Sequence, residues 1–291
     1  MKTHKKFTVV VCTYKREKLL KRCLIKILNN DFRPSKIIII DQNTDKKSYS
    51  TCKRIFKKYK FNKFKILKNI HKIGLTKSKN ISLKYVKTKY VVFLDDDILI
   101  SKKFFKNLID LIFSKKAHGV CGVITNLKNN KIKNFFYYLT NFGAYKDNRF
   151  YFQNYKKYLK KNIYHKKIKS LPGGITCFNS SIFSKIKFDD KYITHNYEDV
   201  DFSIRLKRII PDYQFYISLN SPCIDGLKKI QKENISLRFK FMYLLFLKNK
   251  SVYFLVTFFL SFVGLLFSNM KKINFLLIKE FYSILVNQKI K

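Results

Sequence analysis

Apolar residues along the first hundred positions alternate between continuous runs and helical spacing. The runs Phe7–Cys12, Lys36–Ile40 and Tyr90–Leu94 are rich in β-branched or aromatic residues, which is typical of buried strands. Between the first two runs, leucine and isoleucine recur at helical spacing, which predicts an amphipathic helix. We therefore expect an α/β fold with a mixed, mainly parallel sheet and helices on both faces. In such folds ligands bind beyond the carboxyl ends of the strands.

The same periodicity predicts the remaining elements of this domain. Further strands are expected at Phe64–Lys68 and His118–Ile124. Helices are expected at Leu19–Leu28, Lys47–Lys58, Thr76–Val86, Lys102–Phe113 and Tyr197–Arg208. The segment Thr125–Ser170 is aromatic and Lys-rich without a clear period, so we expect an insertion or a lid there.

The C-terminal part of the chain has a different composition. Ser251–Met270 contains no charged residue across 20 positions, and lysines precede and follow it. At 1.5 Å per residue, a helix of this length just spans a hydrocarbon core of about 30 Å. We expect membrane contact, while a helix buried against the domain or lying in the membrane interface stays open because polar residues interrupt the run. The predicted organisation is a domain at 1–225 and a helical, membrane-associated region at 226–291.

Positive charge is extreme in this chain. The 62 Lys and Arg residues against 18 Asp and Glu residues give a formal net charge of +44. Such a charge attracts polyanions, including nucleic acids, anionic lipids and nucleoside diphosphates. Only eight of the 62 cations are Arg, the residue that nucleic-acid surfaces favour for its bidentate hydrogen bonds. We therefore expect an anionic membrane surface, and no nucleic acid, among the partners.

The cysteines and the N-terminus bear on cellular location. The six cysteines lie far apart with no Cys-x-x-Cys pair, so buried reduced thiols are expected. Met1–Lys6 is charged and leads directly into an apolar strand, without the apolar core of a signal peptide. These features predict a protein on the cytoplasmic face of the cell membrane, held peripherally or by a single C-terminal segment.

Acidic residues are scarce, yet six of the 18 lie in two short windows. Asp95, Asp96 and Asp97 follow a predicted buried strand, and Glu198, Asp199 and Asp201 begin a predicted helix. Adjacent carboxylates at a strand end suit Mg²⁺ or Mn²⁺, which prefer oxygen ligands and substrate phosphates. Two alternatives stay open, namely that the first window is a solvated acidic turn and that the second complements a helix dipole.

Several motifs in register accompany these windows. They are Cys12-Thr13-Tyr14-Lys15-Arg16, Asp41 after the second strand, Gly74-Leu75-x-x-x-Lys79-Asn80, Leu94 to Asp97, Pro172-Gly173-Gly174, and Tyr197-Glu198-Asp199-Val200-Asp201-Phe202. In order and spacing they resemble the family 2 glycosyltransferases, whose nucleotide-sugar domain has the GT-A fold. The resemblance covers about Phe7 to Ile217. It implies an inverting enzyme that uses a nucleotide-activated sugar.

The resemblance also implies roles for residues of the first half. The nucleotide-sugar pocket would comprise Thr13, Tyr14, Arg16, Asp41, Gly74, Lys79, Asn80, Asp95 and Asp96. Within it, Asp41 would accept a hydrogen bond from the nucleobase, although an ordinary turn carboxylate is the alternative. Lys79 stands where the family usually has Arg, which keeps the charge but loses the planar fork.

The remaining roles concern the cation and the reacting groups. Asp97, helped by Asp95, would bind the Mg²⁺ or Mn²⁺ that bridges the two phosphates. Asp199 would be the base that takes the acceptor proton. Contacts to the acceptor or donor sugar would come from Gly173, Gly174, Glu198 and Asp201, where a plain turn is the alternative for the glycines. Many relatives place a His near the metal after the last core strand, and Asp225 is the candidate substitute here.

The function expected from these features is metal-dependent, inverting transfer of a sugar. The donor would be a nucleotide sugar, with UDP as the expected nucleotide, and the acceptor a lipid-linked saccharide or a cell-surface polysaccharide. One alternative is nucleotidyl transfer, although Thr13 to Arg16 lacks the Gly-rich phosphate loop usual for that chemistry. The other is a non-catalytic protein that binds polyanions through its charge.

Overall fold

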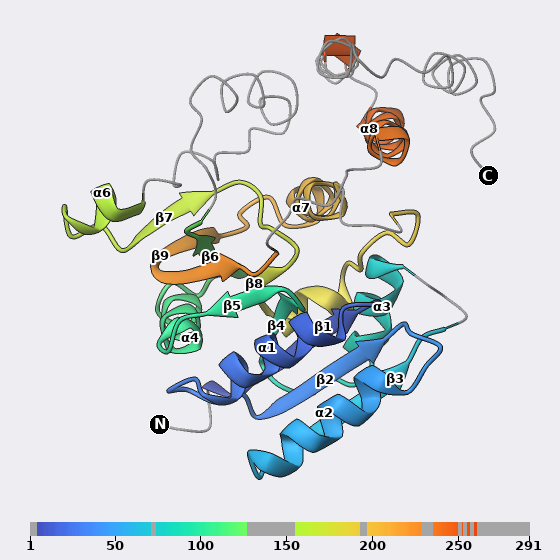
Figure 1. Cartoon of the computed structure of the whole chain (residues 1–291). Helices are drawn as coiled ribbons and strands as arrows, with labels where there is room; N and C mark the ends of the chain where they lie inside the picture. The colour runs from blue at the N-terminus through green and yellow to red at the C-terminus, as the bar shows by residue number, and fades with distance from the viewer. Residues whose placement is uncertain are drawn as a thin grey trace. The chain divides into compact units, whose positions relative to one another are not determined.

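The computed structural model describes residues 5–70, 74–126, 155–192, 197–227 and 235–249, with isolated positions at 252, 255, 256, 259 and 260. The chain divides into two compact units (Figure 1). One comprises Met1–Asn129 and Asn148–Lys228, and the other Asn130–Asp147 and Lys229–Lys291. The division at Lys228 lies close to the predicted boundary at 225, but residues 130–147 group with the C-terminal unit.

The first half of the larger unit is the predicted parallel sheet. Its strands are β1 (Phe7–Thr13), β2 (Lys36–Asp41), β3 (Phe64–Lys68) and β4 (Tyr90–Asp95), in the order β3-β2-β1-β4. All three pairings are parallel, as the continuous apolar runs predict. The side chains of β1, β2 and β4 are almost completely buried, so these strands form the centre of the core.

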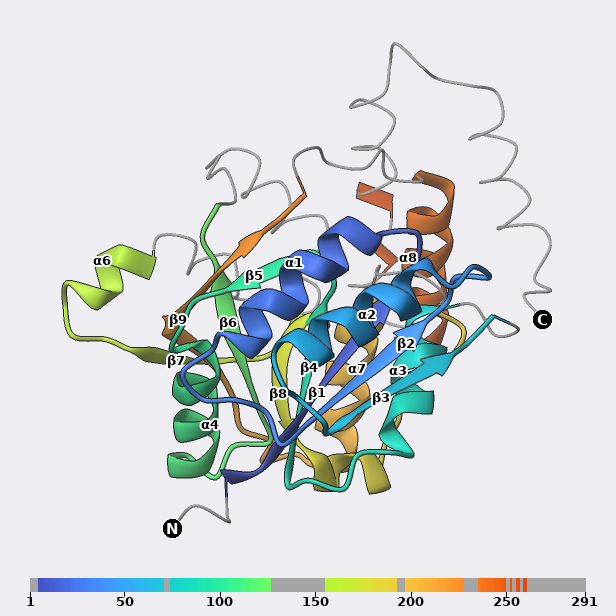
Figure 2. The same cartoon turned by 60° about the horizontal axis from the view of Figure 1, so that its bottom comes forward.

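Right-handed crossovers decide which face of the sheet each helix covers. The chain moves outward from β1 to β3, so α1 (Glu17–Leu28) and α2 (Lys47–Lys58) lie together on one face, in front of the sheet in Figure 2. It then returns to β4, which places α3 (Leu75–Leu83) on the other face. Helix α3 ends before the predicted Val86, because the amides of residues 84–86 donate to the third preceding carbonyl rather than the fourth.

The second half of the sheet is mixed. It contains β5 (Ile98–Ile100), β6 (Gly119–Ile124), β7 (His165–Ile168), β8 (Ile175–Asn179) and β9 (Phe215–Asp225). Strand β8 runs antiparallel to both β4 and β6, and β9 runs antiparallel to β5 and β7 but parallel to β6. Parallel and antiparallel pairings are therefore equally frequent among the described strands. The expectation of a mainly parallel sheet holds only for the first half.

The segment predicted to be irregular, Thr125–Ser170, contains regular structure in its described part. Helix α6 (Tyr155–Leu159) precedes strand β7, which pairs with β9. Strand β7 has the sequence His-Lys-Lys-Ile, with only Ile168 buried, so it lacks the apolar run that would have indicated a strand. Residues 127–154 of the predicted insertion lie outside the described residues.

The remaining described elements are helical. Helices α4 (Phe104–Ser114) and α7 (Glu198–Ile209) match the predictions to within two residues at each end, and a short 3₁₀ turn, η4, spans Ser180–Ser184. In the C-terminal unit, α8 spans Ile235–Asn249. Most of the apolar segment 251–270 lies outside the described residues. Among those described, no helix combines the length and the apolar character needed to cross a membrane.

Candidate active site

Five chain segments meet at the carboxyl edge of the parallel strands. In the strand register Thr13 pairs with Asp41, and Cys12 pairs with Asp95. The Asp95 amide donates to the carbonyl of Gly174, 2.9 Å away, which brings the start of β8 to the same edge. Asp225, at the end of β9, pairs with Ile98 next to the acidic triplet. The sheet thus gathers the acidic triplet, the glycine pair and Asp225 around one edge, and Gly173 lies beside Glu198 of the second window.

Asp96 and Asp97 are held by the last residue of β1, Thr13, and by Arg16 in the loop that follows. The Thr13 hydroxyl donates to Asp96 Oδ2 at 2.7 Å, and Arg16 Nη1 lies 2.8 Å from Asp97 Oδ2 and 3.4 Å from Asp96 Oδ1. Burial raises the pKa of Asp96 to about 7 despite these partners. Burial, with the repulsion of Asp95, raises the pKa of Asp97 to about 6. Burial therefore outweighs the stabilisation that Thr13 and Arg16 give to these carboxylates.

The carboxylate of Asp95 lies against the backbone of Gly174. A Cβ atom added to Gly174 would lie 1.8 Å from Asp95 Oδ2 and 2.1 Å from its Cγ. Only glycine fits beside this carboxylate, because any side chain would displace it. The space at Gly174, assigned from the motif to a sugar, is occupied here by one of the protein's own carboxylates.

Asp41 is completely buried beneath the loops after β2 and β3. Its Oδ1 accepts hydrogen bonds from the amide and the side chain of Asn43, at 3.0 and 2.7 Å. Lys68 Nζ lies 2.7 Å from Oδ2. Asn43 Oδ1 in turn accepts from the amide of Lys15, 2.6 Å away, so this network links the loops after β1 and β2. The predicted contact of Asp41 with a nucleobase stays a prediction.

Two other residues of the predicted nucleotide pocket lie at the rim. The Tyr14 side chain is 41% exposed, which leaves its ring accessible to a ligand. The Gly74 amide donates to Gln42 Oε1 at 2.7 Å, and Gly74 has a φ of 151°, which favours glycine at the start of α3. This hydrogen bond joins the loop before α3 to the end of β2.

Lys79 and Asn80, both on α3, have protein partners rather than open space. Lys79 Nζ lies 3.3 Å from Glu198 Oε1, and the Lys79 side chain is only 2% exposed. Burial lowers the pKa of Lys79, but the charges of Glu198, Asp95, Cys12 and Asp199 outweigh it, so the pKa is raised. The Asn80 side chain donates to the carbonyl of Phe188 and to Asp190 Oδ1, at 2.8 and 2.7 Å. Their predicted places in the nucleotide-sugar pocket stay predictions.

The second acidic window begins α7. Glu198 and Asp201 are buried, whereas Asp199 is partly exposed. Burial raises the pKa of Glu198, although Lys79 opposes the shift. Asp201 Oδ2 accepts from Arg205 Nε at 2.7 Å, one helical turn away. Asp199 Oδ1 accepts from the Val200 amide at 2.8 Å, as expected for a carboxylate in the first turn of a helix.

The sequence matches a known family over most of the domain that carries this site. The profile of Glycosyl transferase family 2 matches residues 8–187, more than half of the chain. The chain belongs to this family. It is therefore a glycosyltransferase, and the GT-A fold expected from the motifs is confirmed.

Curated relatives of this glycosyltransferase share short to moderate stretches with it. An uncharacterized glycosyltransferase of Methanocaldococcus jannaschii is 29% identical over 222 residues, 72% of this chain and 67% of the relative. The GalNAc(5)-diNAcBac-PP-undecaprenol beta-1,3-glucosyltransferase of Campylobacter jejuni is 28% identical over 121 residues, 42% of this chain and 38% of the relative. The minor teichoic acid biosynthesis protein GgaB of Bacillus subtilis is 29% identical over 38% of this chain. That match spans only 12% of GgaB.

Solved structures share the fold at low sequence identity. The mannosyltransferase PcManGT of Pyrobaculum calidifontis, in complex with GDP-Man and Mn²⁺, has a TM-score of 0.60 at 14% identity, over 88% of this chain and 68% of its own. S. aureus TarS 1-349 in complex with UDP-GlcNAc has a TM-score of 0.54 at 15% identity, over 82% of this chain and 65% of its own. At these identities the likeness concerns the fold alone.

The acidic triplet of the glycosyltransferase suits a hard divalent cation. Carboxylate oxygens are the donors that Mg²⁺ and Mn²⁺ prefer, and the raised pKa values of Asp96 and Asp97 indicate that positive charge would be accommodated. No group of three His, Cys, Asp or Glu side chains surrounds a common point among the described residues. A cation there would need further ligands from substrate phosphates. Asp225 adds negative charge near Asp97 and raises its pKa, which is compatible with the predicted substitution for His.

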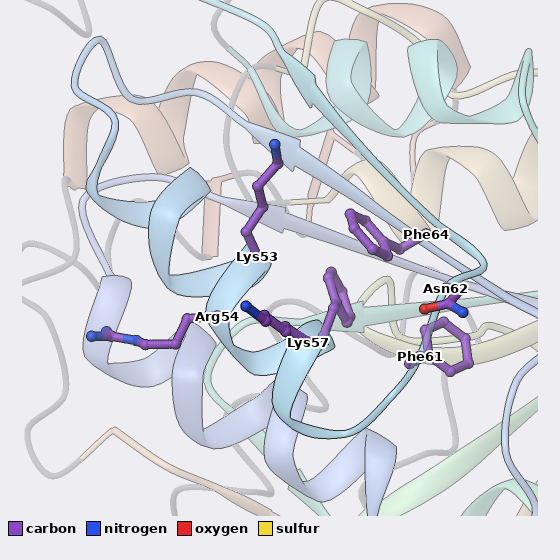
Figure 3. Close-up of a pocket in the computed structure, with 7 residues that line it drawn as sticks. Lys53, Arg54, Lys57, Phe61, Asn62 and Phe64 are labelled. Carbon is purple, nitrogen blue, oxygen red and sulfur yellow. The ribbon is translucent and has the colours of Figure 1, made fainter.

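A separate pocket lies at the opposite edge of the sheet. It has a volume of about 370 Å³ and lies between α2 and the start of β3, where its lining includes Lys53, Lys57, Phe61 and Phe64 (Figure 3). Phe64 pairs with Ile37 at the start of β2, whereas the site lies at the end of that strand. None of the predicted site residues lines this pocket.

Several residues that organise the site were not singled out from the sequence. Gln42, Asn43, Lys68 and Arg205 each bind a predicted site residue or connect its loops. Arg205 follows Asp201 at the i, i+4 spacing of a helical ion pair, a signal that was available. The others depend on loop geometry, which apolar periodicity does not encode.

Proposed function

We propose that this glycosyltransferase transfers a sugar from a nucleotide-sugar donor, with UDP as the expected nucleotide, to a saccharide hydroxyl with inversion and with the help of Mg²⁺ or Mn²⁺. The observation that carries the proposal is the convergence of the two acidic windows at one sheet edge, linked through the backbone of Gly173 and Gly174. One window suits a cation and a diphosphate. The other offers a partly exposed carboxylate for proton transfer.

The nucleotide would bind across the ends of β1, β2 and β4. Asp97 and Asp95 would hold the cation, which neutralises charge on the departing nucleoside diphosphate. Arg16, whose guanidinium pairs with Asp96 and Asp97, would turn toward a phosphate once the cation takes its place. Two solved structures with this fold contain UDP-GlcNAc, or GDP-Man with Mn²⁺, which supports a nucleotide-sugar donor.

Asp199 would act as the base. Its carboxylate takes the proton of the acceptor hydroxyl while the acceptor oxygen forms a bond to the anomeric carbon. The bond between that carbon and the diphosphate oxygen breaks on the opposite side, so the configuration inverts. The start of α7 favours this role because the Val200 amide donates to Asp199 Oδ1 and holds the carboxylate in place.

The acceptor would be a lipid-linked saccharide or a cell-surface polysaccharide. Among the relatives, one acts on an undecaprenol-linked saccharide by its name and one belongs to teichoic acid biosynthesis. A protein with a net charge of +44 would bind the anionic inner leaflet at about 1 kcal/mol for each lysine close to the surface. We therefore place the reaction at the cytoplasmic face of the cell membrane.

A donor screen tests this function. Purified protein is incubated with UDP- and GDP-linked sugars, with Mn²⁺ or with EDTA, and release of the nucleoside diphosphate is followed. We expect cation-dependent release from one donor, abolished by Asp97→Ala and retained by Asp31→Ala, which removes an exposed acid outside the site. No release from any nucleotide sugar, together with ligand binding unaffected by Asp97→Ala, would overturn the proposal.

A further inference from the structure

Lys79 occupies an unusual position for a lysine. Its side chain is 2% exposed, and its ammonium group lies 5.1 Å above the ring of Phe188 and 6.0 Å from that of Phe93. A buried ammonium needs a counter-ion, and Glu198 Oε1 supplies one at 3.3 Å. This ion pair joins α3 to the first residue of α7, more than a hundred positions along the chain.

The glycine loop before β8 is built around this ion pair. A Cβ atom on Gly173 would lie 2.7 Å from Lys79 Nζ, 2.8 Å from Glu198 Oε1 and 3.7 Å from Asp199 Cβ. Gly173 therefore packs against the ion pair, and a side chain at this position would also contact Asp199, the residue after Glu198. Three distant segments, namely α3, the glycine loop and α7, meet at Lys79.

The start of α7 has a strained backbone that needs such support. Tyr197, which immediately precedes the helix, has a φ of 63° and a ψ of 0°, a left-handed conformation that costs about 1–2 kcal/mol for a residue with a side chain. Glu198 is the next residue, and its Oε2 is buried without a hydrogen-bond partner among the described residues. The contact with Lys79 thus holds Glu198 where its charge would otherwise be poorly compensated.

We infer that Lys79 is a positioning residue for Asp199: its ammonium group fixes Glu198 and the glycine loop, so that the first turn of α7 presents Asp199 to the acceptor. This inference rests on the proposed role of Asp199 as the base. It departs from the expectation that Lys79 contacts the donor in the nucleotide-sugar pocket. Direct binding would require a 2% exposed ammonium group, covered by Gly173, to reach a ligand.

The inference separates turnover from nucleotide binding. We expect Lys79→Met to lower kcat by about 100-fold, the cost of displacing a reacting group by ~1 Å. The Kd for the nucleoside diphosphate with Mn²⁺ should change by less than about threefold, because no donor contact is lost. Lys79→Arg, which keeps the positive charge, should retain most of the turnover. Lys84→Met, at an exposed position directly after the last residue of this helix, is the matched control.

A double-mutant cycle with Glu198→Gln identifies the partner. If Lys79 acts through Glu198, the loss of kcat in the double variant should be no larger than the greater single loss. Multiplicative losses, or a Kd for the nucleotide that rises about tenfold in Lys79→Met, would overturn the inference and return Lys79 to the donor site. Glu198→Asp, which keeps the charge but shortens the side chain, replaces Lys79→Met if that variant does not fold. It should lower kcat and leave the Kd unchanged.

Failure of the proposed function can be distinguished from failure of the inference about Lys79. If the wild-type protein turns over no nucleotide sugar, the donor proposal fails before any Lys79 variant is compared. The inference, which rests on that proposal, then falls with it. If the wild type does turn over a nucleotide sugar but Lys79→Met binds the nucleoside diphosphate about tenfold more weakly by calorimetry, the inference alone fails.

Discussion

The two acidic windows of this glycosyltransferase face the same sheet edge but are neutralised differently. In the first, Arg16 pairs with both Asp96 and Asp97, and their carboxyl pKa values remain raised. In the second, the buried acids each have a cation from a neighbouring element or turn, Lys79 for Glu198 and Arg205 for Asp201. Burial also raises the pKa of Glu198, to about 7, so the windows differ in their cations rather than in the direction of the shift. Arg16 alone serves two carboxylates of the first window, which leaves room there for further positive charge. The second window is a scaffold in which each buried acid has its own cation, around the partly exposed Asp199.

The largest effect should come from the carboxylate that this scaffold presents. Asp199→Asn removes the base but keeps the shape, so kcat should fall by about 10²- to 10⁴-fold. Nucleotide binding with Mn²⁺ should stay within a few-fold of wild type, because the first window is intact. Steady-state kinetics and calorimetry measure the two quantities, with Asp212→Asn at an exposed loop as the control. Equal losses of kcat and of nucleotide affinity in Asp199→Asn would mean that the two windows are not functionally distinct.

The two adjacent glycines allow each window to be disturbed separately. In Gly174→Ala the new methyl group displaces the Asp95 carboxylate, so the affinity for Mn²⁺ should fall by about 10- to 100-fold. Gly173→Ala instead meets Lys79 and Glu198, so kcat should fall while the Mn²⁺ affinity changes little. Metal titrations followed by nucleotide binding report the first effect, and turnover at saturating metal reports the second. If Gly174→Ala and Gly173→Ala changed kcat and the Mn²⁺ affinity to the same extent, the two windows would not have separate functions.

The first window should also make the stability of the metal-free protein depend on pH. The pKa values of Asp96 and Asp97, about 7 and about 6, lie above the ordinary carboxyl value, so the folded state binds protons more tightly than the unfolded state. The free energy of unfolding from these groups is therefore highest near pH 4 and falls as the pH rises through 7. We expect roughly 3 kcal/mol from Asp96 between pH 5 and 8, since one pKa unit corresponds to ~1.4 kcal/mol and its pKa lies about two units above pH 5.

Urea denaturation of the wild type and of Asp96→Asn at each pH isolates this contribution. The difference between the two proteins should shift by that amount between pH 5 and 8 in EDTA, and Mn²⁺ should reduce it because the cation binds the ionised carboxylates. A difference that is independent of pH would show that Asp96 is already neutralised within the protein.

The two windows also differ in how far the sequence predicted them. The first follows a continuous apolar strand, so Thr13, Asp41 and Asp95 could be placed at one edge from local pattern alone. The second reaches that edge only through β8, an antiparallel strand inserted beside β4 after a long stretch of chain. The partners of Lys79 and Gly173 depend on that insertion. Apolar periodicity carries no information on pairings between segments so distant in sequence.

The smallest expected effect distinguishes the cations of the two windows. Arg205→Met leaves Asp201 buried without its ion-pair partner and should lower the free energy of unfolding by about 1 kcal/mol, a modest value because Arg205 is 27% exposed. Added Mn²⁺ should not restore this loss, because the second window does not bind the cation.

For Arg16→Met, in the first window, we expect the opposite response to Mn²⁺. Its loss of stability in EDTA should be reversed by Mn²⁺, because the cation replaces the missing guanidinium beside Asp97. Thermal unfolding of both variants with and without Mn²⁺ measures the contrast. If Mn²⁺ restored the stability of Arg205→Met, or failed to restore that of Arg16→Met, the cation would not act by supplying positive charge to the first window. In the predicted case, the arginine of the loop after β1 is a resident counter-ion that the metal displaces when the donor arrives.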